Sequence, residues 1–149
     1  MARVYLFAEP GPLVRVFYTI DQAVGKNSPN QREDVFLVQF FLRRVLEGQH
    51  LTIPGESTLA IDGLYGNQTA RYIEFYQKHE NLVQDGVVSS PGAGRIVQAP
   101  GGEYYMILSL NLQYGYIFGR EQHANIAQDP LCPTGQFPSI FFTAGARKR

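Results

Sequence analysis

Two copies of a short turn motif constrain this chain more than any other feature of its sequence. The first copy, DGLYG, occupies residues 62–66, and the second, DGVVS, occupies residues 85–89. In each copy the glycine permits a positive φ angle, and the aspartate accepts hydrogen bonds from nearby backbone N–H groups. We therefore expect two closed turns of the same kind, each lying beside a helix.

The residues before the first turn have helical periodicity. Apolar residues recur at spacings of three and four, which predicts a helix with one buried face made of Val35, Val38, Leu42 and Val45. The helix begins either at the capping sequence Ser28-Pro29 or at Asp34, and it should end near Gly48.

A second helix is predicted between the two turns, over residues 68–78. Its inward-facing residues are expected to be Tyr72, Ile73 and Tyr76, and Asn67 or Thr69 is expected to cap its start.

The order of these elements resembles the peptidoglycan-binding-like domain, a small three-helix module. The resemblance covers residues 34–97. Its motif residues are Val35, Val38, Gln39 and Leu42 on the first helix, Asp62, Gly63, Tyr65, Gly66 and Thr69 at the first turn, Tyr72, Ile73, Tyr76 and Gln77 on the second helix, and Leu82, Asp85, Gly86 and Val88 at the second turn. The sequence departs from the family at Ser89 and Gly92, where glycine and threonine are usual.

The resemblance implies contact with peptidoglycan without catalysis. We assign turn and capping roles to Asp62, Gly63, Gly66, Thr69, Asp85 and Gly86. The candidate binding residues are Tyr65, Tyr72, Tyr76, Gln77 and Gln39. Two interpretations stay open for them: the tyrosines either pack in the core or stack on a sugar, and the glutamines either bind a turn backbone or contact a ligand.

Extended segments are predicted on both sides of this module. Residues 1–27 predict a hairpin arm, with its turn at residues 9–12 and with Val14, Val16, Tyr18 and Ile20 on one face. In residues 99–149, apolar side chains alternate with small polar ones between Leu108 and Phe118, which predicts a long strand. A short strand near residues 139–143 and a basic tail at residues 147–149 follow. The predicted fold is α+β: a helical module over residues 28–98 with β-strands on both flanks.

Composition narrows the possible functions. The 13 basic and 13 acidic residues balance, so the chain lacks the positive charge that nucleic-acid binding requires. The most apolar stretch contains Gln39, Arg43 and Arg44, so we expect no membrane span. No signal peptide is evident, because Glu9 and Pro10 interrupt the first apolar run. We expect synthesis in the cytoplasm and a final location in a virion or another extracellular particle.

The sequence offers no set of residues typical of an active site. His50, His79 and His123 are widely separated, which argues against a metal, and no cofactor motif is present. Cys132 has no neighbouring catalytic motif, and Glu74 and Glu80 are interpreted as a solvated helix face. We therefore expect a protein that is not an enzyme.

Two hypotheses follow. In the first, the chain is a structural and binding subunit of a phage virion, a tail or baseplate, or a related injection assembly, and it forms a homo-oligomer or contacts other subunits. In the second, it is a stand-alone peptidoglycan-binding module that targets a partner wall hydrolase.

Overall fold

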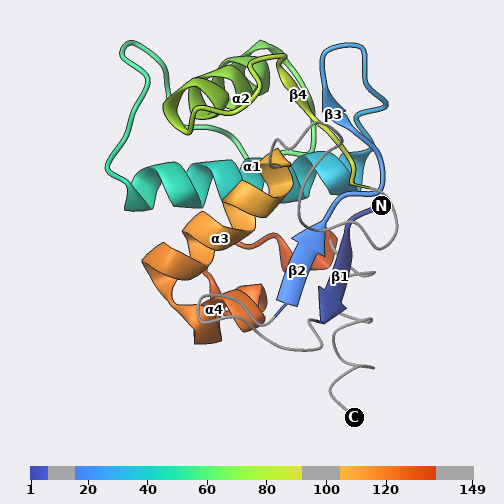
Figure 1. The fold of residues 1–149 in the computed structure, drawn as a ribbon, viewed down its shortest axis with the longest axis vertical. Coiled ribbons are helices and arrows are strands. Elements are labelled where there is room, and N and C mark those ends of the chain that lie inside the picture. The colour runs from blue at the N-terminus through green and yellow to red at the C-terminus, as the bar shows by residue number, and fades with distance from the viewer. Residues whose placement is uncertain (7–15, 92–104, 137–149) are drawn as a thin grey trace.

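A computed structural model describes residues 1–6, 16–91 and 105–136 of the 149-residue chain. These residues form a small α+β fold of helices and two short antiparallel sheets, one made of β1 and β2 and the other of β3 and β4 (Figure 1). In order, the elements are β1 (Arg3–Leu6), β2 (Val16–Thr19), β3 (Val24–Gly25), α1 (Arg32–Gly48), α2 (Asn67–His79), β4 (Val87–Val88), α3 (Met106–Phe118) and α4 (Arg120–Ala124), followed by two short 3₁₀ turns at Ile126–Gln128 and Thr134–Gln136.

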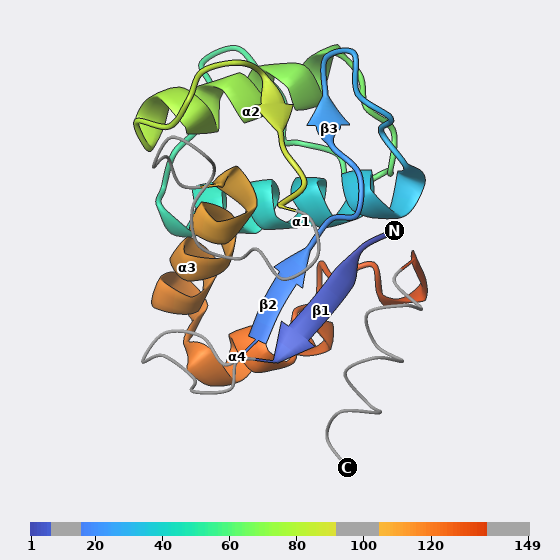
Figure 2. The same cartoon turned by 45° about the vertical axis from the view of Figure 1, so that its right-hand side comes forward.

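Helix α1 is the central element of the fold. The predicted apolar face is buried, and so are Phe36, Leu37, Phe40 and Phe41, which point in other directions around the helix. The reason is that α1 is covered on two sides, by α2 on one and by α3 on another (Figure 2). A helix that is apolar nearly all round is the expected result of such double coverage.

The bounds of α1 and α2 lie close to those predicted from the sequence, but the residues predicted to cap them do not do so. Helix α1 ends at Gly48 as expected, but it begins at Arg32 with Gln31 as an N-cap that makes no side-chain cap bond. Helix α2 begins after Gly66, also without a side-chain cap. Ser28 instead donates to the Lys26 carbonyl at 3.2 Å, so the capping sequence at Ser28 forms part of the preceding loop.

The N-terminal hairpin is confirmed. β1 and β2 pair antiparallel, with Val4 opposite Tyr18 and Leu6 opposite Val16. The opposite face of β2 is buried as well, since Phe17 and Thr19 are both buried. The predicted turn at residues 9–12 and Val14 lie outside the described residues.

The predicted long strand between Leu108 and Phe118 is wrong: this segment is helix α3. Its residues satisfy both periods, since Ile107, Leu110, Asn111 and Tyr114 recur at helical spacings and are all buried. Length decides between the two, because a run of 13 residues is ordinary for a helix and long for a strand. The C-terminal flank is therefore helical where the structure describes it; the predicted strand at residues 139–143 and the basic tail lie outside the described residues.

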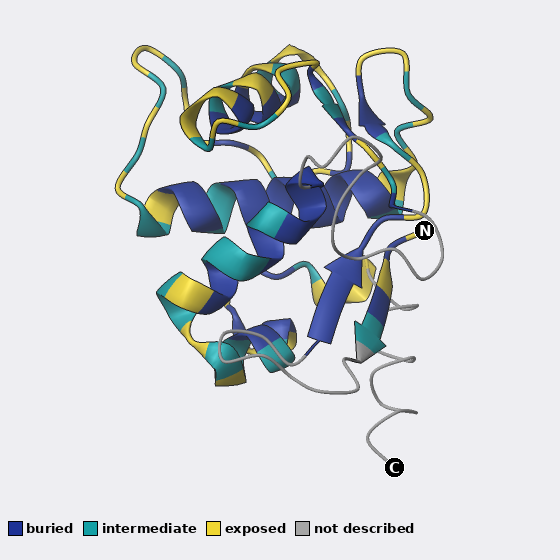
Figure 3. Cartoon of the chain, in the orientation of Figure 1, coloured by how far each residue is buried: buried dark blue, intermediate teal, exposed yellow. Residues whose placement is uncertain are grey.

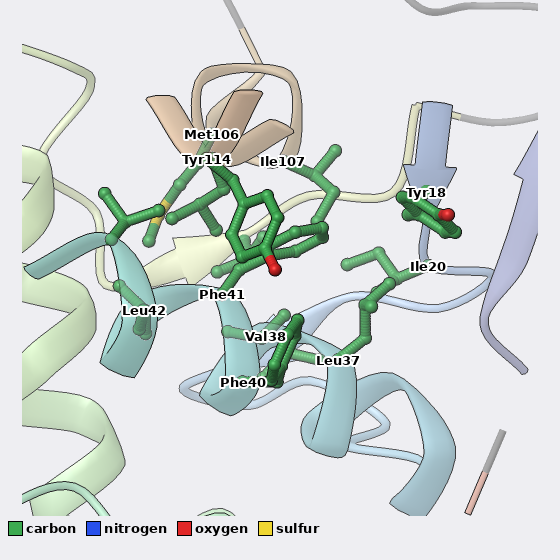
Figure 4. Packing of buried hydrophobic residues seen from close by; sticks show 14 of the residues in the cluster. Tyr18, Ile20, Leu37, Val38, Phe40, Phe41, Leu42, Met106, Ile107 and Tyr114 are labelled. Carbon is green, nitrogen blue, oxygen red and sulfur yellow. The ribbon is translucent and has the colours of Figure 1, made fainter. Parts of the chain in front are cut away.

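Aromatic rings form the centre of the core where α1, α3 and β2 meet (Figure 4). Phe41 lies 5.4 Å from Tyr114 and 6.1 Å from Tyr18 between ring centroids, and Phe40 lies 5.8 Å from Tyr114. The tilted arrangements are those that aromatic pairs favour. One hydrophobic cluster includes residues from the hairpin, the central helices and α3, so the predicted divisions at residues 27 and 98 separate segments that share one core.

Buried polar groups connect the hairpin to α3. The Asn111 side chain accepts the N–H of Tyr18 at 2.9 Å and donates to the Tyr18 carbonyl at 2.7 Å. It thus satisfies the edge of β2 as a residue of a third strand would.

A second buried group ties α1 to the C-terminal region. The carboxylate of Asp129 accepts hydrogen bonds from Arg44 Nε and the Tyr114 hydroxyl, both at 2.8 Å. The Arg44 guanidinium also lies over the Phe118 ring, 4.6 Å from its centroid. The buried carboxylate is therefore paired with a cation and hydrogen-bonded, as burial of a charge requires.

Candidate binding site

The first Asp-Gly turn is held by one buried glutamine on α1. Gln39 Oε1 accepts the backbone N–H groups of Asp62 and Gly63 at 3.0 and 2.8 Å. Its Nε2 donates to Asp62 Oδ1, the Leu64 carbonyl and Thr69 Oγ1, each at 3.0 Å. A single amide group thus fixes the turn and the first turn of α2 together.

The second Asp-Gly turn repeats this arrangement with Gln77 of α2. Gln77 Oε1 accepts the N–H of Gly86 at 2.9 Å, and Nε2 donates to Asp85 Oδ1 and the Val87 carbonyl at 3.1 Å. In both turns the aspartate also accepts the backbone N–H two residues later at 3.0 Å. The sequence repeat is therefore a structural repeat, and both glutamines bind a turn backbone.

Glycine is required at the second position of the first turn. Gly63 has a φ of 74°, and a Cβ placed there would come within 2.5 Å of the Phe36 ring. Gly86 has a φ of 71°. The turn roles assigned to Asp62, Gly63, Asp85 and Gly86 are confirmed. Thr69, by contrast, accepts from Gln39 in place of capping α2, and Gly66 has an extended backbone.

The three candidate tyrosines do not form a common exposed face. Tyr76 is 0% exposed and its hydroxyl lies 2.8 Å from Ser109 Oγ; Tyr72 is 7% exposed and donates to the Ser57 carbonyl at 2.6 Å. Burial raises the pKa of both hydroxyls. Tyr65 is half-buried and packs against the core. The core-packing interpretation therefore holds for Tyr72 and Tyr76.

The outer side of α2 carries a groove that the sequence pattern did not predict. It has a volume of about 420 Å³ and is lined by Ile53, Arg71, Glu74, Phe75, Lys78 and Gln84. The half-buried Phe75 ring is stacked on His79, with centroids 6.5 Å apart and planes 8° apart. The signal was present in the sequence as an aromatic residue among charged ones at helical spacing on the exposed side of α2.

Charges of both signs border this groove. Arg71 pairs with Glu56, with Nη2 and Oε1 3.0 Å apart, and this bond lowers the pKa of the Glu56 carboxyl. The pair ties the loop before the first Asp-Gly turn to α2. Glu74 and Lys78 are exposed at the next positions along the helix. An aromatic ring surrounded by polar groups suits a ligand with one apolar face and many hydroxyl or amide groups.

The groups most often used in catalysis occupy structural positions. His123 is completely buried, and burial lowers its pKa to about 3. Its Nε2 lies 2.9 Å from Asn111 Oδ1, an acceptor, so Nε2 carries the proton and the ring is neutral. Cys132 is buried, and burial raises the pKa of its thiol to about 12, which keeps it protonated.

The remaining histidines, His50 and His79, are exposed on separate elements. Across residues 1–6, 16–91 and 105–136, no three His, Cys, Asp or Glu side chains are grouped as metal ligands. Within the same part of the chain, none of the helices combines the length and apolar character needed to cross a bilayer.

Comparison with known proteins identifies no relative of this chain: no protein-family model, curated protein or solved structure matches it.

Proposed function

We propose that this chain is a non-catalytic structural and binding subunit that carries a peptidoglycan-binding-like module. The observation that carries the proposal is the pair of glutamine-held Asp-Gly turns at the two ends of α2. The motif residues of the resemblance act together as one scaffold, which is what a member of such a family would need. We propose further that the subunit belongs to a phage virion, a tail or baseplate, or a related injection assembly.

The positions of the reactive side chains support a binding function over a catalytic one. The Cys132 thiol and the His123 imidazole are buried and held in their neutral forms. The groove beside α2 is lined instead by an aromatic residue and by charged residues on the outer side of the helix. Such a surface can hold a ligand without altering it.

The groove also favours a second function, a stand-alone module that binds peptidoglycan and targets a partner wall hydrolase. Phe75 supplies an apolar platform, and Arg71, Glu74, Lys78 and Gln84 supply donors and acceptors around it. Glycan strands present hydroxyl and amide groups around rings with apolar faces, and their stem peptides carry carboxylates. This chemistry matches that of the groove.

Co-sedimentation with isolated peptidoglycan sacculi tests both functions. The change Phe75→Ala removes the platform, and Leu64→Ala is the matched control, because Leu64 is 63% exposed and does not line the groove. We expect saturable pelleting of the natural protein and of Leu64→Ala, and a loss of at least about tenfold in affinity for Phe75→Ala. Circular dichroism confirms that each variant is folded.

Two results would contradict the proposal. Equal pelleting of both variants would remove the groove as the binding site, and no pelleting at about 100 μM, a weak affinity even for a single small interface, would remove peptidoglycan as the ligand. Changing Tyr72 or Tyr76 is no substitute for this test, since both rings are buried and their loss would act on folding.

A further inference from the structure

Helix α3 presents an uncharged surface to solvent. Its sequence, MILSLNLQYGYIF, contains no acidic or basic residue. One side packs on α1, α4 and β2, while Ser109, Leu112 and Gln113 are half-buried and Tyr116 is 73% exposed on another side (Figure 3). A solvent-facing helix surface normally carries charged residues, so this side is unusual for a free surface.

A preformed groove lies on the same side of α3. It has a volume of about 260 Å³ and is lined by Glu80, Leu82, Leu108, Ser109, Leu112 and Gln113. Gln49 connects its two walls, since its Nε2 donates to Glu80 Oε1 at 2.9 Å and to Gln113 Oε1 at 3.3 Å. Ser109, which lines the groove, forms a hydrogen bond with Tyr76, with 2.8 Å between the two hydroxyl oxygens. The groove is therefore a fixed feature of the packing between α2 and α3.

The exposed ring of Tyr116 lies in line with this groove. Residues 109, 113 and 116 are spaced i, i+4 and i+7, which places them within about 60° of one another around the helix. Tyr116 follows Ser109 by about 10 Å along the axis. One helix face thus carries both a groove lined by leucine and polar side chains and, two turns further on, an exposed aromatic side chain.

We propose that the occupant of the groove is Tyr116 of a second copy of this chain. Two α3 helices packed antiparallel about a two-fold axis that passes between residues 112 and 113 bring Tyr116 of each copy opposite Ser109 of the other. Each ring then fills the hollow between Leu82, Leu108 and Leu112. A two-fold interface requires this self-complementarity of one surface patch.

The size and charge of the surface support this occupant. The groove, of about 260 Å³, is open to solvent and offers a tyrosine ring both leucine side chains to pack on and polar groups at its border. Because α3 has no charged residue, antiparallel pairing opposes no like charges along the helix. The Tyr116 hydroxyl is a donor that arrives at the groove rim, where Glu80 offers a carboxylate acceptor.

The buried area sets the strength of this dimer. Each aromatic ring contributes at most about 150–250 Å², so two rings and their leucine neighbours fall below the roughly 1,200 Å² of stable complexes. We therefore expect a dimer with a Kd on the order of 100 μM. In the proposed assembly, on whose structural role this inference rests, many subunits at high local concentration would make so weak a contact effective.

Sedimentation velocity between about 5 and 500 μM, a range that spans the expected Kd, tests the proposal. The natural protein should change from monomer to dimer over this range. Tyr116→Ala and the groove-filling change Ser109→Trp should each weaken association at least about tenfold, the loss typical of a central interface residue. Leu64→Ala removes an exposed apolar side chain away from α3 and should dimerise normally. Folding of each variant is checked by circular dichroism.

The register is tested by cross-linking. Gln113→Cys places a thiol beside the two-fold axis and should form a disulfide-linked dimer when an oxidant is added, whereas Gln84→Cys, in the groove of α2, should not. A monomer at every concentration, a dimer that Tyr116→Ala leaves intact, or equal cross-linking of the two cysteine variants would overturn the proposal. Sacculus binding distinguishes this failure from that of the proposed function, since folded Tyr116→Ala should still pellet.

Discussion

The part of the molecule around α2 and the part around α3 differ in how their buried polar groups find hydrogen-bond partners. Around α2, two glutamines hold turns that lie 8 to 25 residues away along the chain. Around α3, Asn111 binds Tyr18 from a distance of 93 residues, and Asp129 binds Arg44 from a distance of 85. The first part repeats one local device, while the second depends on single long-range bonds.

This difference predicts that the second part is the more fragile. The bonds of Gln39 and Gln77 to their turns close loops of at most 25 residues, so less chain entropy opposes them. A side chain that joins segments far apart in sequence holds ends that chain entropy would separate.

The largest effect is expected for Asn111→Leu. The change preserves shape but leaves the N–H and carbonyl of Tyr18 and the Nε2–H of His123 buried without partners. At roughly 1–3 kcal/mol for each such group, the free energy of unfolding should fall by about 4 kcal/mol. Urea denaturation followed by circular dichroism measures the loss. Gln113→Leu on the same helix, which is half-exposed, should change it by less than about 1 kcal/mol; equal losses would show that α3 is generally intolerant.

A smaller loss of folding free energy is expected when the glutamine that holds each of the two turns is replaced. Gln39→Met should lower the free energy of unfolding by about 3 kcal/mol, because it leaves the buried N–H of Gly63 and the Thr69 hydroxyl without their partner. Gln77→Met should cost about 2 kcal/mol, because its turn has fewer bonds and Asp85 is exposed. The same denaturation experiment ranks them; the reverse order would mean that the second turn is the principal one.

An effect of about the same size as that of Gln77→Met is expected from the dependence of stability on pH, which we assign to His123. Its pKa falls to about 3 in the folded protein, so between pH 3 and about 6.5 the unfolded chain binds a proton that the native state does not. Stability is therefore retained above that window and lost as the pH falls through it, by about 2 kcal/mol between pH 7 and pH 5.

Urea midpoints at the two pH values measure this slope. His123→Gln should flatten it, and His50→Asn, a change at an exposed position, should leave it intact. If the slope persists in His123→Gln, other groups carry the pH dependence.

The same contrast explains how far the sequence predicted this structure. The hairpin, both module helices and the two turns were predictable, because each is encoded within a few consecutive residues whose spacing matches one period. Helix α3 was predicted wrongly, since Leu108 to Phe118 satisfies two periods at once, and the length of the run, which favours a helix, was not weighed against the strand period. The roles of Asn111 and Asp129 leave no local signal, because their partners lie in distant segments.

Some residues of the candidate site were likewise predictable from the sequence and others were not. The duplicated motif allowed the prediction that Gln39 and Gln77 bind the turn backbones. Tyr72 and Tyr76 were wrongly offered as binding residues, because a ring that faces the core and a ring that faces a ligand have the same helical spacing. The groove beside α2 depends on Ile53, which comes from the loop between the helices and has no fixed position in a linear pattern.

The double coverage of α1 has a consequence for whether part of this chain could fold when separated from the rest. A domain that moves between proteins by gene fusion must keep its folding free energy when it is cut from its neighbours. Here the helix that carries Gln39 for the first turn also carries Phe40, Phe41 and Arg44 for the part around α3. We therefore expect that residues 28–98 cannot be excised as a separately folding unit, because their central helix needs the flanking segments to cover its other side.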